Sequence, residues 1–155
     1  MTTEIEFAVD RFGNKYDVAE ELDNIMNNTK HLTLGTTNDD GWPRATPLKF
    51  AYHDGKIVWG SLNYSIHRHN IEHDPRIFIS IVNKDKEMNR SICVKTIAHR
   101  LPENEVKDAI MALKKWGEFN PDGYTYYFAC LGEVDKKKTE AEWHNHYFDN
   151  AKELK

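Results

Sequence analysis

The sequence predicts a mainly β fold, in which antiparallel strands form a barrel and a few helices pack on its outside. Two observations predict it. Most of the expected strands are joined by short turns, whereas a parallel sheet would need a crossover helix between most of its strands. The 155 residues, of which 39% are hydrophobic and 12% aromatic, suffice for one packed core, despite a mean hydropathy of −0.74.

Composition also limits the organisation and the partners of the chain. We expect a single domain over residues 1–155, with an N-terminal extension over 1–15 and a C-terminal tail over 136–155, because no linker or repeat interrupts the sequence. Lys and Arg total 21 against 25 Asp and Glu, a net charge of −4, which argues against general nucleic-acid binding. No run of about 18 apolar residues is present, so no membrane span is expected.

The cysteines and the first residues favour a cytoplasmic location. Cys93 and Cys130 lie far apart and form no CxxC motif, which is typical of a reduced protein rather than of a disulfide scaffold. Residues 1–4 lack the basic region and the apolar core that a signal peptide needs.

The chain is expected to begin with a short strand and a helix. Ile5, Phe7 and Val9 alternate with acidic residues, which indicates a strand before a turn at 12–14. A helix is expected over 16–28, because its apolar residues recur at spacings of three and four. These apolar residues are Val18, Leu22, Ile25 and Met26.

Three strands joined by tight turns should follow. The turn signals are Asn-Asp-Asp-Gly at 38–41 and His-Asp-Gly at 53–55. Pro43 and Pro47 restrict the middle strand to an edge or a bulged place, because proline cannot donate to a ladder. The three strands are expected over 31–37, 44–52 and 56–60.

The second half is expected to alternate helices and strands. A short helix over 65–73 should end at Asp74-Pro75, because the residue before proline disfavours helical backbone. A second helix should begin at Leu101-Pro102 and run to about Trp116. Strands are expected over 76–82, 91–99 and 124–134.

Several short motifs in this order are similar to those of a known family. They are Thr33-Leu34-Gly35-Thr36 before Asp40-Gly41, Pro43-Arg44-Ala45-Thr46-Pro47-Leu48-Lys49, Val58-Trp59-Gly60-Ser61, Ser65-Ile66-His67-Arg68-His69-Asn70-Ile71 and Asp74-Pro75-Arg76. Together they resemble the FMN-binding split barrel of the pyridoxamine 5′-phosphate oxidase-like superfamily. The resemblance is densest over residues 31–82.

The resemblance implies a function and an assembly. The implied function is that of an FMN-dependent oxidoreductase acting on a small molecule, with a reduced nicotinamide, NAD(P)H, as a possible electron donor. The family also implies a homodimer with FMN in the interface cleft. The alternatives are a non-catalytic flavin- or haem-binding or sensor protein on the same barrel, and a deazaflavin-dependent reductase. Oxidation of vitamin B6 is not carried over, because the tail lacks the basic motif of the full-length oxidases.

The candidate cofactor residues suit the chemistry of FMN, whose phosphate needs cations and hydroxyl or amide donors. In the family, residues at the places of Arg44 and Lys49 contact the phosphate and the flavin ring. Their odd separation on a strand would put them on opposite faces, so a bulge near Pro47 is expected. The backbone of Ala45, Thr46 and Pro47 is expected along the ring edge. Trp143 is a candidate for the partner-side wall of the cleft.

Four further candidates cluster where a strand ends and a helix begins. Ser61 ends the strand and Ser65 opens the helix, where free backbone amides attract phosphate. His67 and Arg68 lie in the first turn of that helix. The ordinary alternatives are a turn and an N-cap for the serines, a solvated strand face for Arg44 and Lys49, and a surface histidine.

His67 departs from the family, which usually has a lysine there. A titratable charge therefore replaces a fixed one. We expect His67 to be partly protonated beside the phosphate and the affinity for FMN to fall as the pH rises above neutrality. No metal site is expected: measured from His67, His69 lies about 200° and His73 about 240° around the helix, so the three do not share a face.

Overall fold

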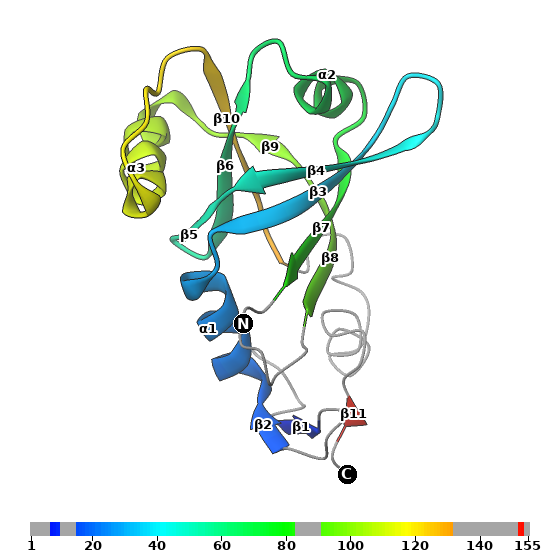
Figure 1. Ribbon diagram of the computed structural model, residues 1–155, viewed down its shortest axis with the longest axis vertical. Coiled ribbons are helices and arrows are strands. Elements are labelled where there is room, and N and C mark those ends of the chain that lie inside the picture. Colours follow the sequence, from blue (N-terminus) through cyan, green and yellow to red (C-terminus); the bar gives the residue numbers. More distant parts are fainter. Residues whose placement is uncertain (1–6, 10–14, 83–90, 132–151, 154–155) are drawn as a thin grey trace.

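The computed structural model describes residues 7–9, 15–82, 91–131 and 152–153. Two four-stranded antiparallel sheets dominate it (Figure 1). The first sheet has the strand order β4-β3-β7-β8 and the second the order β5-β6-β10-β9. A small third sheet pairs β11 (Lys152–Glu153), β1 (Phe7–Val9) and β2 (Lys15–Asp17). The predicted mainly β, antiparallel class is confirmed.

Most predicted elements are found close to their expected bounds. The strands of the first sheet are β3 (His31–Thr37), β4 (Pro43–Lys49), β7 (Arg76–Val82) and β8 (Ser91–Ile97). Those of the second sheet are β5 (Ala51–His53), β6 (Lys56–Leu62), β9 (His99–Arg100) and β10 (Tyr124–Ala129). The helices are α1 (Val18–Asn28), α2 (Ile66–His73) and α3 (Glu103–Leu113), with a 3-10 turn over Lys114–Trp116.

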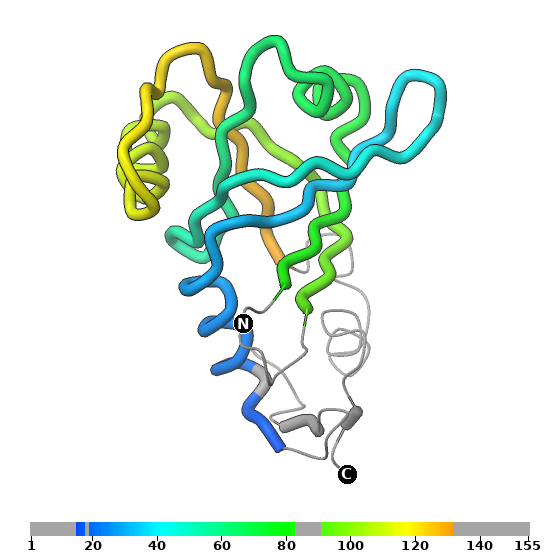
Figure 2. The backbone as a smooth tube through the Cα atoms, in the orientation of Figure 1, coloured from blue at the N-terminus to red at the C-terminus, as the bar shows by residue number. Residues whose placement is uncertain are grey.

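Two bends join the sheets into a split barrel, and the chain can be followed through both in Figure 2. The strand expected over 44–52 divides at Phe50, so that β4 belongs to the first sheet and β5 to the second. Phe50 is fully buried; its N–H donates to the carbonyl of Lys30, and its carbonyl accepts from the indole of Trp116. Ala98 makes the matching bend between β8 and β9.

The β3–β4 hairpin projects beyond the sheets next to α2 (Figure 1). Its ladder is continuous from the pair Thr37 and Pro43 to the pair His31 and Lys49. The bulge expected near Pro47 is therefore absent, and the proline is tolerated because β4 is an edge strand. Gly41 takes the positive φ of 86° that the predicted turn requires.

The core lies between the two sheets, and a second apolar cluster lies outside the barrel. Inward-facing side chains such as Leu34, Trp59 and Ile79 form the interior with the buried face of α1. The outer cluster packs α3, through Ala109 and Leu113, against the other face of β5, β6 and β10. No helix within the described residues is long and apolar enough to cross a membrane.

Candidate functional site

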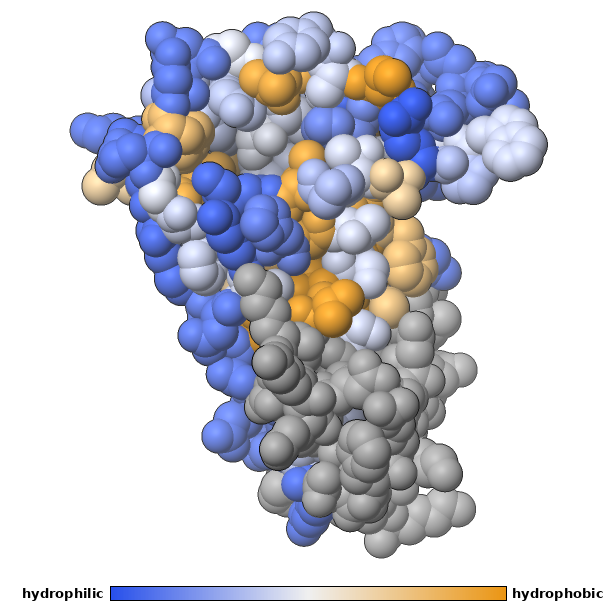
Figure 3. Space-filling view, in the orientation of Figure 1, coloured by the Kyte–Doolittle hydropathy of each residue, from blue (hydrophilic) through white to orange (hydrophobic). Residues whose placement is uncertain are grey.

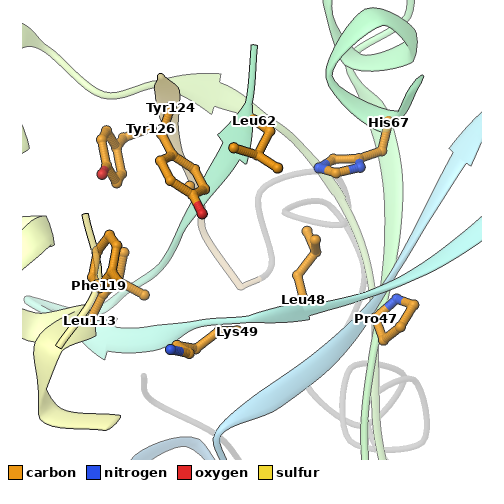
Figure 4. A pocket seen from close by; sticks show the side chains of 10 residues that line it. Pro47, Leu48, Lys49, Leu62, His67, Leu113, Phe119, Tyr124 and Tyr126 are labelled. Atoms are coloured by element: carbon orange, nitrogen blue, oxygen red, sulfur yellow. The ribbon is translucent and has the colours of Figure 1, made fainter. Parts of the chain in front are cut away.

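The candidate site is a pocket at the free edge of β4, outside the barrel core. Its volume is about 240 Å³, and it opens between the end of β4, the outer face of β6 and β10, and the first turn of α2 (Figure 4). Apolar side chains gather in the middle of the face seen in Figure 3. The pocket is lined by Pro47, Leu48, Lys49, Gly60, Leu62, His67, Leu113, Phe119, Tyr124 and Tyr126.

The position of β4 explains how Pro47 and Lys49 both reach the pocket with Leu48. Alternation puts Leu48 on one face of the strand and its two neighbours on the other. Because β4 is the outermost strand of its sheet, a pocket along its free edge can be lined from both faces. The bulge expected near Pro47 is absent, and of the two predicted cations on β4, Arg44 and Lys49, only Lys49 lines the pocket.

The wall opposite β4 is aromatic. Tyr124 and Tyr126 come from β10, and Tyr124 packs edge-on against Phe119 with ring centroids 6.0 Å apart. The ammonium of Lys49 lies 5.6 Å from the centre of the Phe119 ring. A Cβ atom on Gly60 would come within 2.8 Å of the Tyr126 ring. Glycine at this place therefore lets the aromatic wall approach β6.

The first turn of α2 brings His67 to the pocket, whereas Ser65 and Arg68, at the start of the same helix, do not line it. Ser65 is the N-cap: its hydroxyl accepts from the backbone N–H of Arg68 and donates to the carbonyl of Leu62 at 2.8 Å. The Arg68 guanidinium bonds the hydroxyl of Thr125 at 3.1 Å and the carbonyl of Asn63 at 3.3 Å. Capping is thus confirmed for Ser65, and it leaves the positive end of the helix dipole facing this region.

His67 points into the pocket (Figure 4) and is only 8% exposed. Burial first, and then the positive charge of Arg44, lowers the pKa of its imidazole below the ordinary value of 6.5. Its Nε2 lies 3.3 Å from the Ser65 hydroxyl. In this ligand-free state the lowered pKa favours the neutral imidazole, whereas the partial protonation expected beside a bound phosphate stays a prediction. The fall of FMN affinity with rising pH stays a prediction, because a phosphate nearby would stabilise the charged imidazole.

Arg44 lies close enough to His67 for its charge to act on the imidazole, but it does not line the pocket itself. Its Nε donates to the side-chain oxygen of Asn38 at 3.0 Å. The same oxygen accepts from the buried amide of Asn70 in α2 at 2.8 Å, and that amide also reaches the Thr36 hydroxyl at 3.0 Å. The hairpin and α2 therefore hold the guanidinium in a fixed place.

The structure does not bring the other predicted residues to the pocket. Ser61 is fully buried, on the face of β6 that carries Trp59 into the core, and its hydroxyl has no partner among the described residues. Ala45 and Thr46 lie further along β4 and do not line the pocket. Trp143 lies outside the described residues.

Sequence reasoning missed the side chains that β10 and α3 contribute. Tyr124 and Tyr126 stand opposite Leu62 and Gly60 in the β6–β10 ladder, and Leu113 and Phe119 border the same space. The paired residues of β6 and β10 are separated by more than sixty residues of sequence, so no local pattern could predict this pairing. The alternation of Tyr124, Tyr126 and Phe128 is the one signal that could have marked this face.

The fold and this pocket define a split-barrel protein with a cation-bordered site on its outside. The family model described as pyridoxamine 5′-phosphate oxidase matches residues 18–125. The chain therefore belongs to the pyridoxamine 5′-phosphate oxidase family. None of the curated proteins matches the chain by sequence.

Solved structures share the fold at low sequence identity. A FAD-binding protein from Mesorhizobium loti is 18% identical with a TM-score of 0.60, over 73% of this chain and 88% of that one. An F420 reductase is 15% identical with a TM-score of 0.60, over 70% and 91%. A haem-binding protein from Mycobacterium smegmatis is 23% identical with a TM-score of 0.62; the match covers 75% of this chain but only 52% of that protein.

We expect the ligand-free protein to lose stability as the pH falls below about 6.5, the ordinary pKa of histidine. His67 has a lowered pKa in the folded state, so the unfolded chain binds more protons than the folded protein in this pH range. Acid therefore stabilises the unfolded chain relative to the folded protein. Denaturant midpoints measured on both sides of this pH should differ less in His67→Gln than in the parent. His53→Gln, at an exposed position, should keep the parent's pH dependence; equal slopes in all three proteins would contradict the prediction.

Proposed function

We propose that this chain binds FMN in the pocket at the free edge of β4 and acts as a flavin-dependent oxidoreductase on a small molecule, with NADH or NADPH as the electron donor. The observation that carries the proposal is the lining itself, in which Lys49 and His67 border an apolar, aromatic-walled slot beside the N-terminus of α2. Membership of the family and the FAD-binding relative in fold support a flavin.

The polar end of the pocket suits a phosphate. Ser65, His67 and Arg68 lie at the start of α2, and the charge of Arg44 acts on His67. Two guanidinium groups, an imidazole and a helix N-terminus are the groups that bind phosphate in proteins. Arg44 and Arg68 would hold it through their charge and through hydrogen bonds from their guanidinium groups, and Ser65 and His67 would orient it through further hydrogen bonds.

The other end suits a flat ring. The free edge of β4 presents backbone groups that its own sheet does not pair, and these would bond the polar edge of an isoalloxazine. Leu62 and Tyr124 would exclude water from one face, and Lys49 would place a positive charge beside the ring. A bound flavin supplies the hydride and electron transfer. We assign no catalytic acid or base.

A homodimer is part of the proposal. Small-molecule sites usually measure about 300–1,000 Å³, whereas this pocket measures about 240 Å³ in one chain. A second copy would supply the missing wall, and Trp143 stays the candidate for the partner's contribution. Light scattering of the FMN-loaded protein should give the mass of two chains.

The cofactor test uses the purified full chain. We expect it to quench the fluorescence of added FMN saturably at micromolar concentrations and to release FMN again on heating. NADH or NADPH should then bleach the bound flavin's visible absorbance under anaerobic conditions. Failure to take up FMN would refute the whole proposal, whereas uptake without reduction by either nicotinamide would refute the oxidoreductase part.

Haem and deazaflavin are the second candidates, because relatives in fold are a haem-binding protein and an F420 reductase. Around the pocket the described residues offer one imidazole, His67, as an axial haem ligand. Titration of the same preparation with haemin and with F420 separates these cases. A Soret shift that His67→Ala abolishes would favour haem over FMN.

A further inference from the structure

Three side chains of the types that can bind metal ions meet on the exposed side of α2. His69 and His73 lie four residues apart on the helix, a rotation of only about 40° from one to the other. Asp39 joins them from the β3–β4 hairpin, and one ligand atom of each residue lies within 4.8 Å of the others. This is the single such group of His, Cys, Asp and Glu that the described part of the chain contains. None of the three lines the pocket.

The contacts within the cluster orient its ligand atoms. The Nε2 atom of His69 lies 2.7 Å from Oδ2 of Asp39, and the two imidazole rings lie 4.1 Å apart. Nδ1 of His73 lies 2.8 Å from the backbone carbonyl of His69. A carbonyl only accepts, so Nδ1 carries the hydrogen and Nε2 of neutral His73 keeps a lone pair. In metal sites, a ligating histidine commonly donates its other ring N–H to a carbonyl in this way, and the bond fixes the orientation of the ring.

We propose that Asp39, His69 and His73 form a binding site for a divalent transition metal, with Zn²⁺ as the first candidate. Two imidazoles and a carboxylate suit Zn²⁺, and three protein ligands leave one position for water. A histidine pair four residues apart on one helix face is a known zinc-ligand spacing. Tetrahedral coordination needs ligand atoms about 3.3 Å apart. The Nε2 atom of His69 and Oδ2 of Asp39, now 2.7 Å apart, would have to move apart to about 3.3 Å. Their side chains are 48% and 70% exposed, so they can make this movement without disturbing the core.

The position of the site gives it a structural consequence. Asp39 follows Asn38, whose side chain accepts hydrogen bonds from Arg44 and from Asn70 of α2. A metal shared by Asp39 and the two histidines would fasten the projecting hairpin to α2 through a second set of bonds. The guanidinium of Arg44 would then be held more rigidly.

The test is a calorimetric titration of the metal-stripped, tag-free full chain with ZnCl₂. We expect one Zn²⁺ per chain with micromolar or tighter affinity, and a rise in the melting temperature. Even changes outside the ligand sphere cost about tenfold or more in metal affinity, so His69→Ala and His73→Ala should each weaken binding by at least that factor. With Co²⁺ as the probe, visible d–d absorbance should report nitrogen and oxygen ligands, and it should vanish in both variants.

Two controls separate this site from the other histidines. His53→Ala removes an exposed histidine of β5, and the double change His144→Ala/His146→Ala removes the pair in the tail; both proteins should bind Zn²⁺ as the parent does. Asp39→Asn tests the third ligand without changing the helix. Absence of saturable binding up to millimolar Zn²⁺, or binding that the His69 and His73 variants leave unchanged, means a surface ion pair only and overturns the proposal.

Discussion

Replacement of Arg44 by alanine should weaken FMN binding about 10- to 150-fold, which corresponds to the 1.5–3 kcal/mol of a hydrogen bond to a charged group. The guanidinium is fixed by Asn38, which α2 holds in turn through Asn70. Its charge already acts on His67 in the pocket. The loss should also reduce the salt dependence of the affinity, because one cation fewer would face the phosphate.

The controls for this prediction distinguish charge from folding. Arg44→Lys keeps the charge but loses the forked donor geometry, so its affinity should fall between those of the parent and Arg44→Ala. Arg76→Ala removes an exposed arginine that pairs with Asp74 and should bind FMN as the parent does. Equal affinity of the parent and a stably folded Arg44→Ala protein would show that Arg44 takes no part in binding.

Local patterns predicted elements well where the decisive interactions are local. The hairpin turn at 38–41, the N-cap at Ser65 and the end of α2 before Pro75 follow from side chains within a few residues. The division of one expected strand at Phe50 could not be predicted in this way. The partners that fix the bend at Phe50, Lys30 and Trp116, are distant in sequence.

The candidate site shows the same limit. The motifs pointed to Lys49, Pro47 and His67, which do line the pocket, but not to the wall from β10 and α3. Burial of His67 depends on tertiary packing, so its lowered pKa is invisible in a sequence that shows only a histidine in the first turn of a helix. The helical rotations of His69 and His73 relative to His67 do not reveal how these two histidines lie relative to each other. They lie on one face of the helix, where Asp39 joins them.

Trp59→Ala should produce the largest loss of stability, about 3–5 kcal/mol, the usual cost of removing a buried aromatic side chain. Trp59 is fully buried in β6, and its ring stacks on that of Tyr127 in β10 with centroids 5.9 Å apart. By volume, Trp59 is the largest of the fully buried side chains among the described residues, and it lies in the interior between the two sheets. Equilibrium urea unfolding of parent and variant measures the difference.

Two further variants identify the cause of that loss. Trp59→Phe keeps most of the packing and also removes an indole N–H that has no partner among the described residues. An unsatisfied buried donor destabilises the folded protein, so its removal offsets part of the packing that is lost. The free energy of unfolding should therefore fall by less than about 1.5 kcal/mol. Trp42→Ala removes an indole that is 71% exposed at the tip of the hairpin, and should stay within about 0.5 kcal/mol of the parent. Similar losses in all three variants would mean that the interior packing of Trp59 does not stabilise the barrel.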